Sequence, residues 1–254
     1  KLLVQTRRED LDSPKFQGAK VNTAFDATTN SLNLTGAGQF DSIADFDAEG
    51  SLDDIGGISP SGSYDFANTL DLGAVFSLDL VRHFKTEGFY PSDLFDSRTA
   101  NLDTWTDFDG TDANDVDAQL FVRTTQDDPS GSPTYSDFQN FTSGTFKARG
   151  FQFRTVLTSS DPAQDIRVFQ LGYSAKFERR VEQSSSVLTS SALTTVPFSS
   201  PFFVGTAALG GANSSLPAVN VTAQNLASGD FFEISDVTAS NFKIHFKNSS
   251  NASI

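Results

Sequence analysis

The stretch KARGFQFRTVLTSSDPAQDIRVFQLGYSAKF, residues 147–177, decides the fold. Its first arm alternates with a period of two, and one face carries Phe151, Phe153, Thr155 and Leu157. Gln152 and Arg154 fall on the opposite face, which is the pattern of a half-buried strand. The turn formers of residues 159–162 follow, and their proline cannot continue a strand ladder. We therefore predict a hairpin of two long strands.

The second arm of this stretch changes phase partway along. Its apolar residues restart at Ile166 and Val168. The next apolar face then carries Phe169, Leu171, Tyr173, Ala175 and Phe177. A one-residue slip moves side chains to the other face of a strand, so it predicts either a bulge or a strand that is buried on both sides.

Composition limits the classes of partner. The 254 residues include 18 Lys and Arg against 32 Asp and Glu, which gives a net charge of −14. Binding to nucleic acid or to an anionic membrane surface needs basic side chains, so neither partner is expected. With no Cys, a disulfide framework and a thiolate metal site are excluded. The absence of Met, even at position 1, predicts an interior or trimmed portion of a longer polypeptide.

The other periodic segments also predict strands, and none has a helical period of useful length. TLDLGAVFSLDLVRHF (69–84) predicts strands broken by a glycine bend, and AQLFVRTT (118–125) alternates cleanly. Two acidic, glycine-containing stretches, 40–64 and 88–110, are expected to be long surface loops. We predict an all-β fold with an antiparallel β-sandwich over residues 41–182. Residues 1–40 are expected to form a lead-in or connector.

Residues 183–254 are predicted to form a second, smaller β module. PAVNVTAQ (217–224), DFFEISDVT (230–238) and NFKIHFKN (241–248) are its expected strands, and residues 196–204 are a fourth candidate. A module of about 70 residues with so few strands is marginal by itself. We expect it to complete its core by oligomerising.

An acidic run that begins in the second long loop and continues beyond it is the candidate metal site. It contains Asp109, Asp112, Asp115 and Asp117. Carboxylate oxygens are the ligands that calcium prefers, which makes calcium the candidate cofactor. The run lacks the terminal Glu of an EF-hand loop, and a solvated acidic loop is the alternative. Two such carboxylates could also serve as the acid and base of glycoside hydrolysis, which requires a separation that the sequence does not give.

The same loop holds the candidate ligand contacts. Trp105 brings apolar area and a hydrogen-bond donor suited to stacking on a sugar ring or anchoring a partner, and a core position under the loop is the alternative. Tyr90, Asp107 and Asp109 are the other candidate contacts. His83 and His245 lie far apart without metal-binding spacing, so each is expected to be an ordinary strand residue. No catalytic residue is predicted.

Two parts of the chain resemble known families. Asp71–Gly73 and residues 117–175, with the segments VRTT and ARGFQFR and an aromatic residue at Phe138, resemble the discoidin-type jelly roll. That jelly roll occurs in the distal part of phage tail host-specificity proteins of the J type. PFSSPFFV (197–204) and residues 216–250 are similar to the small H-type lectin module often found at the end of such proteins.

The resemblance implies a non-enzymatic tail-tip or tail-fibre protein of a virion that attaches to the host surface. A homotrimer would contact other phage tail-tip proteins and bind a host cell-surface glycan or an outer-membrane receptor. Threefold presentation raises the avidity of weak sugar sites. Two alternatives remain open. One is a purely structural collar or connector segment of the fibre, and the other is a carbohydrate-binding module of a secreted hydrolase.

Overall fold

The computed structural model describes residues 3–36, 57–91, 101, 113–178, 180–184, 186–187, 193–206 and 215–254. Within these ranges the regular structure is all β-strand, in one ten-stranded sheet and one three-stranded sheet. The strands are β1 (Leu3–Arg8), β2 (Ala19–Val21), β3 (Thr23–Asp26), β4 (Ser31–Leu34), β5 (Ser61–Asp65), β6 (Leu70–Phe89), β7 (Val116–Thr125), β8 (Gln139–Asn140), β9 (Gly144–Ser159), β10 (Asp165–Phe177), β11 (Thr194–Pro197), β12 (Phe231–Ser235) and β13 (Asn241–Lys247). The predicted all-β, antiparallel sandwich is confirmed. The described residues include no helix of the length and apolarity that crossing a membrane requires.

The chain divides into two compact units. One is Val4–Lys176, and the other is Phe177–Ile254 together with Lys1–Leu3. The division falls six residues before the predicted boundary at 182. Residues 1–40, predicted to be a lead-in, instead supply β1 to β4 to the larger sheet, because β4 and β1 both pair with β10.

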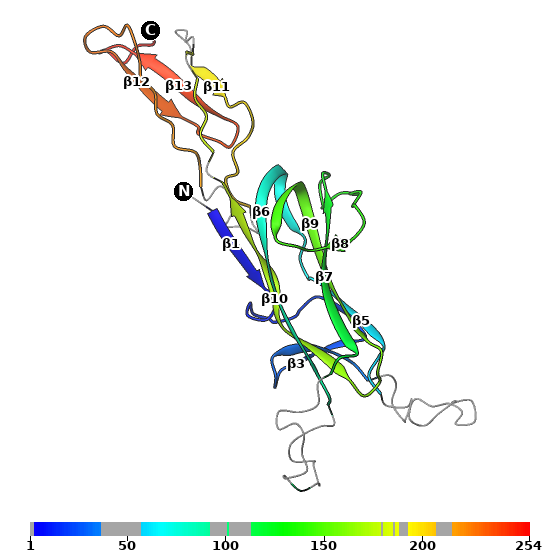
Figure 1. Cartoon of the computed structure of the whole chain (residues 1–254). Helices are drawn as coiled ribbons and strands as arrows, with labels where there is room; N and C mark the ends of the chain where they lie inside the picture. The colour runs from blue at the N-terminus through cyan, green and yellow to red at the C-terminus, as the bar shows by residue number, and fades with distance from the viewer. Residues whose placement is uncertain are drawn as a thin grey trace. The chain divides into compact units, whose positions relative to one another are not determined.

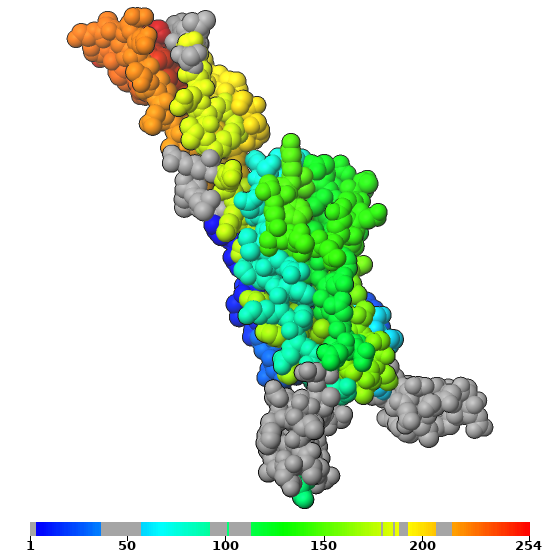
Figure 2. All heavy atoms as spheres, viewed as in Figure 1, coloured from blue at the N-terminus to red at the C-terminus, as the bar shows by residue number. Residues whose placement is uncertain are grey.

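The two longest strands of the larger unit, β6 and β9, each pair with different neighbours along their length. The first half of β9 pairs with β6, and its second half pairs with β5 on one side and β7 on the other. The second half of β6 pairs with β10, which also borders β4 and β1 (Figure 1). In Figure 2 the cyan and green atoms of β6, β7 and β9 cover one face of this unit as a continuous surface.

The predicted hairpin is wrong, although both of its strands exist. β9 and β10 are consecutive, but β6 lies between them in the sheet order. The two strands face each other across the core, where the rings of Phe153 and Tyr173 stack with centroids 4.4 Å apart. Alternation within each strand fixes which face is buried, but it leaves the hydrogen-bonded neighbour undetermined. The core face predicted for β9 is confirmed, since its four residues are all buried.

The phase change in β10 is a β-bulge. Val168 pairs with Thr86 and Gln170 pairs with Lys85, so Phe169 is the extra residue. Phe169 is 38 % exposed and does not join the core, whereas Leu171 and Tyr173 do. Beyond the bulge the strand is buried on both sides, so both predicted outcomes of the phase change are present. At Gly172 an added Cβ would lie 2.1 Å from the Arg7 carbonyl oxygen, so only glycine leaves room for β1 at this position.

Two carboxylates in the turn after β1 are buried. Glu9, 1 % exposed, accepts hydrogen bonds from Arg7 Nε at 2.8 Å and from the Tyr64 hydroxyl. Asp10 accepts from Arg8 and from the backbone N–H of Leu171. Buried charges are tolerated when they are paired and hydrogen-bonded. The charged segment at residues 7–10 therefore fastens the start of the chain to β10 and β5.

The smaller unit has a single three-stranded sheet, in the order β11–β13–β12. Its buried cluster consists of Val196, Phe242 and Ile244. Seven partly buried residues pack around this cluster: Phe198, Val219, Val221, Phe232, Ile234, Val237 and Phe246. Residues 217–224 were predicted to be a strand, but they pair with no other strand among the described residues. Their side chains Val219 and Val221 nevertheless pack against the buried cluster.

Candidate functional site

One end of the larger unit carries the flanks of both long stretches predicted as loops. Gly36 and Ile58 form a β-bridge, so the two flanks of residues 37–56 lie together. Gly88 packs closely against Ala113 and Val116, which brings together the flanks of residues 92–112. The turn between β9 and β10 touches both pairs, because the Pro162 carbonyl accepts from the N–H of Ile58 and the Asp115 carbonyl accepts from that of Ser160. We call this the loop end.

The side chain of Gln164 forms hydrogen bonds with several segments at the loop end. Its side-chain oxygen accepts from the N–H of Asp115 at 2.9 Å. Its Nε2 donates to the Tyr90 hydroxyl at 2.9 Å, to Asp161 Oδ2 at 2.9 Å and to Asp115 Oδ2 at 3.1 Å. The amide therefore joins the residue after β6, the residue before β7 and the β9–β10 turn. Gln164 is buried, so these bonds hold the flanks in a fixed arrangement.

The next residue, Asp165, joins the same end to β4. Its Oδ1 accepts from the N–H of Ile166 at 2.7 Å and from that of Leu34 at 3.2 Å. Burial raises the pKa of Asp165 to about 6, and the two N–H donors and the charge of Arg167 only partly offset this rise. The protonation of one buried carboxyl beside the loop flanks thus changes between pH 5 and 7.

The structure describes three of the predicted site residues. Tyr90 and Asp115 meet at Gln164. Asp117 lies on β7, where its Oδ2 accepts from Gln119 Nε2 at 2.8 Å. Neither aspartate belongs to a group of three potential metal ligands among the described residues. Trp105, Asp107, Asp109 and Asp112 lie outside the described residues, so calcium binding and the sugar contact at Trp105 stay predictions.

Both histidines are strand residues that bond to serine, as the prediction of ordinary strand positions implies. His83 on β6 lies 2.7 Å from Ser174 Oγ, which lies 2.7 Å from Thr6 Oγ1 on β1. Burial and the nearby Arg8 charge lower the pKa of His83. His245 on β13 contacts Ser253 at 2.7 Å. The His83 chain of hydrogen bonds links β6, β10 and β1.

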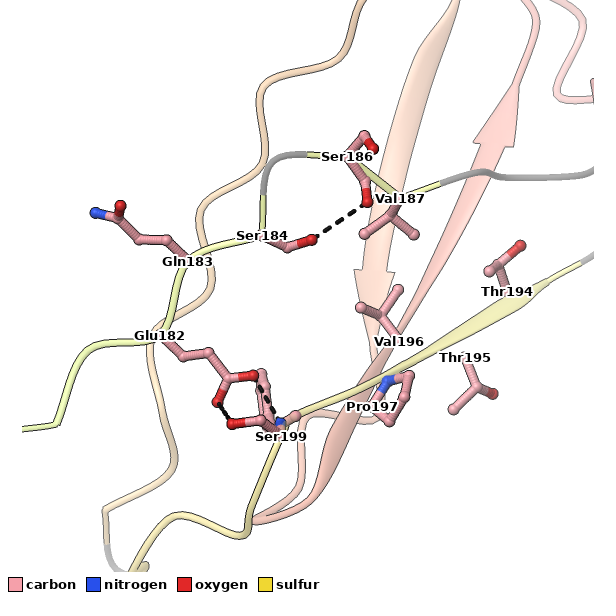
Figure 3. A pocket seen from close by; sticks show the side chains of 11 residues that line it. Glu182, Gln183, Ser184, Ser186, Val187, Thr194, Thr195, Val196, Pro197 and Ser199 are labelled. Carbon is pink, nitrogen blue, oxygen red and sulfur yellow. Dashed lines mark hydrogen bonds between the residues drawn. The ribbon is translucent and has the colours of Figure 1, made fainter.

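A shallow hollow of about 480 Å³ lies in the smaller unit (Figure 3). Ser184, Ser186 and Val187 border it on one side, and β11 borders it on the other. Glu182 is the one ionisable side chain among its described lining residues, and its carboxylate accepts from the backbone N–H and hydroxyl of Ser199. The backbone N–H bond is the main cause that lowers the pKa of Glu182. The hollow thus offers hydroxyl groups and a carboxylate that already has partners.

Sequence reasoning missed Gln164 and Asp165, because neither residue belongs to a recognisable motif. The available signal was their place directly after a predicted turn, where a polar side chain is ordinary. Comparison of the chain with protein-family models, with curated proteins and with solved structures finds no match.

Proposed function

We propose that this chain is the host-contacting part of a phage tail fibre, which binds a cell-surface glycan or receptor as a homotrimer and has no enzymatic activity. The proposal rests on the resemblance to J-type host-specificity proteins and to H-type lectin modules. The observation that favours it most is the gathering of the flanks of residues 37–56 and 92–112 at one end of a rigid sandwich. Rigid β scaffolds commonly carry recognition on the segments that connect their strands.

The thin core of the smaller unit supports the oligomeric part of the proposal. Among the described residues of this unit, seven large apolar side chains are exposed: Val181, Val187, Leu193, Leu216, Leu226, Phe231 and Ile254. Small domains with an incomplete core usually gain stability from oligomerisation. A second and a third copy would cover part of this apolar surface.

The test begins with the mass of the purified chain in solution. The same sample is then incubated with intact bacterial cells, with and without competing surface polysaccharide. A trimer that binds cells and is displaced by the polysaccharide is the expected result. A monomer that binds no cells would refute the proposal.

A structural connector is the second candidate, and the network at Gln164 favours it. The polar groups of Tyr90, Asp115 and Asp161 at the loop end already bond to one amide. A trimer that ignores cells would identify this chain as a bracing segment of the fibre. Binding that disappears when calcium is chelated would instead favour the carbohydrate-binding module of a hydrolase.

A further inference from the structure

The outer face of β5, β9 and β7 carries an unusual row of arginine and aromatic side chains. Register places Asp65 opposite Arg154, and Gln152 opposite Arg123, on neighbouring strands. These positions alternate with the core residues of β9, so they point away from the sandwich interior. The segment that leads into β8 lies over them and supplies Tyr135 and Phe138.

The rings and guanidinium groups stack in an alternating order. The guanidinium of Arg123 lies 4.8 Å from the ring centroid of Tyr135 and 4.6 Å from that of Phe138. The guanidinium of Arg154 lies 4.5 Å from the same Phe138 ring. Cations on aromatic faces attract the ring quadrupole, so the stack holds both guanidinium groups in place.

The two arginines differ in their counter-ions. Asp65 takes two hydrogen bonds from Arg154, at 2.6 and 2.9 Å, in the bidentate arrangement that favours a carboxylate. Arg123 makes no ion pair within the described part of the chain, and only its Nε has a hydrogen-bond partner there, Gln152 Oε1 at 2.9 Å. Arg123 is partly exposed, and neither of its terminal nitrogens is a fully buried atom without a partner.

Arg123 is also held in one orientation. Gln152 Nε2 donates to Thr69 Oγ1 at 2.9 Å, which fixes the amide whose oxygen accepts from Arg123. Two acidic groups of the same unit, Asp71 and Asp128, are already paired with Arg149. An ordered guanidinium whose terminal nitrogens have no partner among the described residues loses little conformational entropy when it binds an anion.

We propose that Arg123 binds a carboxylate of the glycan ligand through its two terminal nitrogens, since its Nε already donates to Gln152 Oε1, and that the ligand is a polysaccharide containing uronic acid. This inference rests on the proposed function and names its ligand class. A carboxylate matches the planar fork of the guanidinium better than a neutral sugar does. Two uncharged polar side chains on the same face, Gln119 and Thr158, suit sugar hydroxyls, and Gln119 Nε2 already donates to Asp117 Oδ2 on that face. The net charge of −14 repels acidic ligands at long range, but salt screens this repulsion beyond about 8 Å.

The test titrates the full chain with tetragalacturonic acid and with its methyl ester, which keeps the rings and removes the charge. We expect the acid to bind and the ester to bind about tenfold more weakly or not at all. Arg123→Gln should weaken acid binding about tenfold or more. Arg82→Gln is the matched control, because Arg82 also lies over a ring, that of Phe84, and has no ion pair with a described residue. It should bind the acid as the unaltered chain does.

Arg123→Lys separates a binding defect from a folding defect. It keeps the positive charge and loses the bidentate fork, so it should fold, as circular dichroism can verify, and still bind the acid weakly. Equal binding of acid and ester, or unchanged acid binding by Arg123→Gln or Arg123→Lys, would overturn the inference. Adhesion to cells is measured on the same variants. Cell binding without uronate binding overturns this inference alone, whereas uronate binding without adhesion counts against the proposed function alone.

Discussion

The two units of this chain bury their apolar side chains to different depths. In Val4–Lys176, aromatic rings such as Phe141, Phe151 and Phe153 are almost entirely enclosed between two layers. In the smaller unit, one sheet packs against extended chain, and most of its apolar residues stay partly exposed. The difference shows that an alternating pattern of apolar residues does not by itself produce a closed core. A second layer is needed to cover the apolar face of the first.

The largest expected effect is on the core of the larger unit. Phe153→Ala removes a buried ring that stacks on Tyr173, and it should lower the free energy of unfolding by about 3–5 kcal/mol. Urea unfolding followed by circular dichroism measures the loss, and hydrogen exchange assigns it to peptides from this unit. A loss below about 1 kcal/mol would mean that this core is no better packed than the other.

A second change tests the buried carboxylate that fastens β1. Glu9→Gln removes the charge that Arg7 and Tyr64 bind, which should destabilise the larger unit by about 2–3 kcal/mol. Glu87→Gln is the matched control, since the Glu87 side chain, which pairs with Arg167, is 57 % exposed. The control should have no measurable effect on urea unfolding. If both variants behaved alike, the contribution of Glu9 would be that of a surface charge.

The third prediction concerns pH. The pKa of Asp165 is raised to about 6, so the native state holds this proton more tightly than the unfolded chain does. The contribution of this group is therefore fully present below about pH 4 and is lost as pH rises through about 6, by about 3 kcal/mol in all. Asp165→Asn keeps an oxygen for the N–H groups of Leu34 and Ile166 and should remove this pH dependence. Unfolding curves at pH 4 and pH 7 measure it, and an unchanged pH dependence in the variant would contradict the assignment.

The smallest effect is expected in the other unit. Val219→Ala trims a partly buried side chain that packs on the three-stranded sheet, and it should cost about 1 kcal/mol. Hydrogen exchange of peptides from β12 and β13 detects so local a change. A cost equal to that of Phe153→Ala would mean that the smaller unit is as well packed as the larger one.

Local patterns in the sequence predicted the strands well where one face is buried. The alternation at residues 151–157 predicted the core face of β9, and the phase change after Val168 predicted the bulge at Phe169. Residues 217–224 alternate in the same way but form no ladder. The reason is that alternation reports the burial of one face, and burial does not require a hydrogen-bonded neighbour.

The sequence by itself determined the all-β class, the long strands and the acidic character of the chain, because each depends on composition or on neighbours a few residues apart. Only the tertiary structure decided that β6 separates β9 from β10 and that Glu9 is buried. It also decided that Gln164 joins Tyr90 to Asp115, and that Arg123 shares the Phe138 ring with Arg154 and has no counter-ion among the described residues. These arrangements join residues from distant parts of the chain. Their energies come from burial and from the pairing of polar groups, and no local pattern records which partners meet.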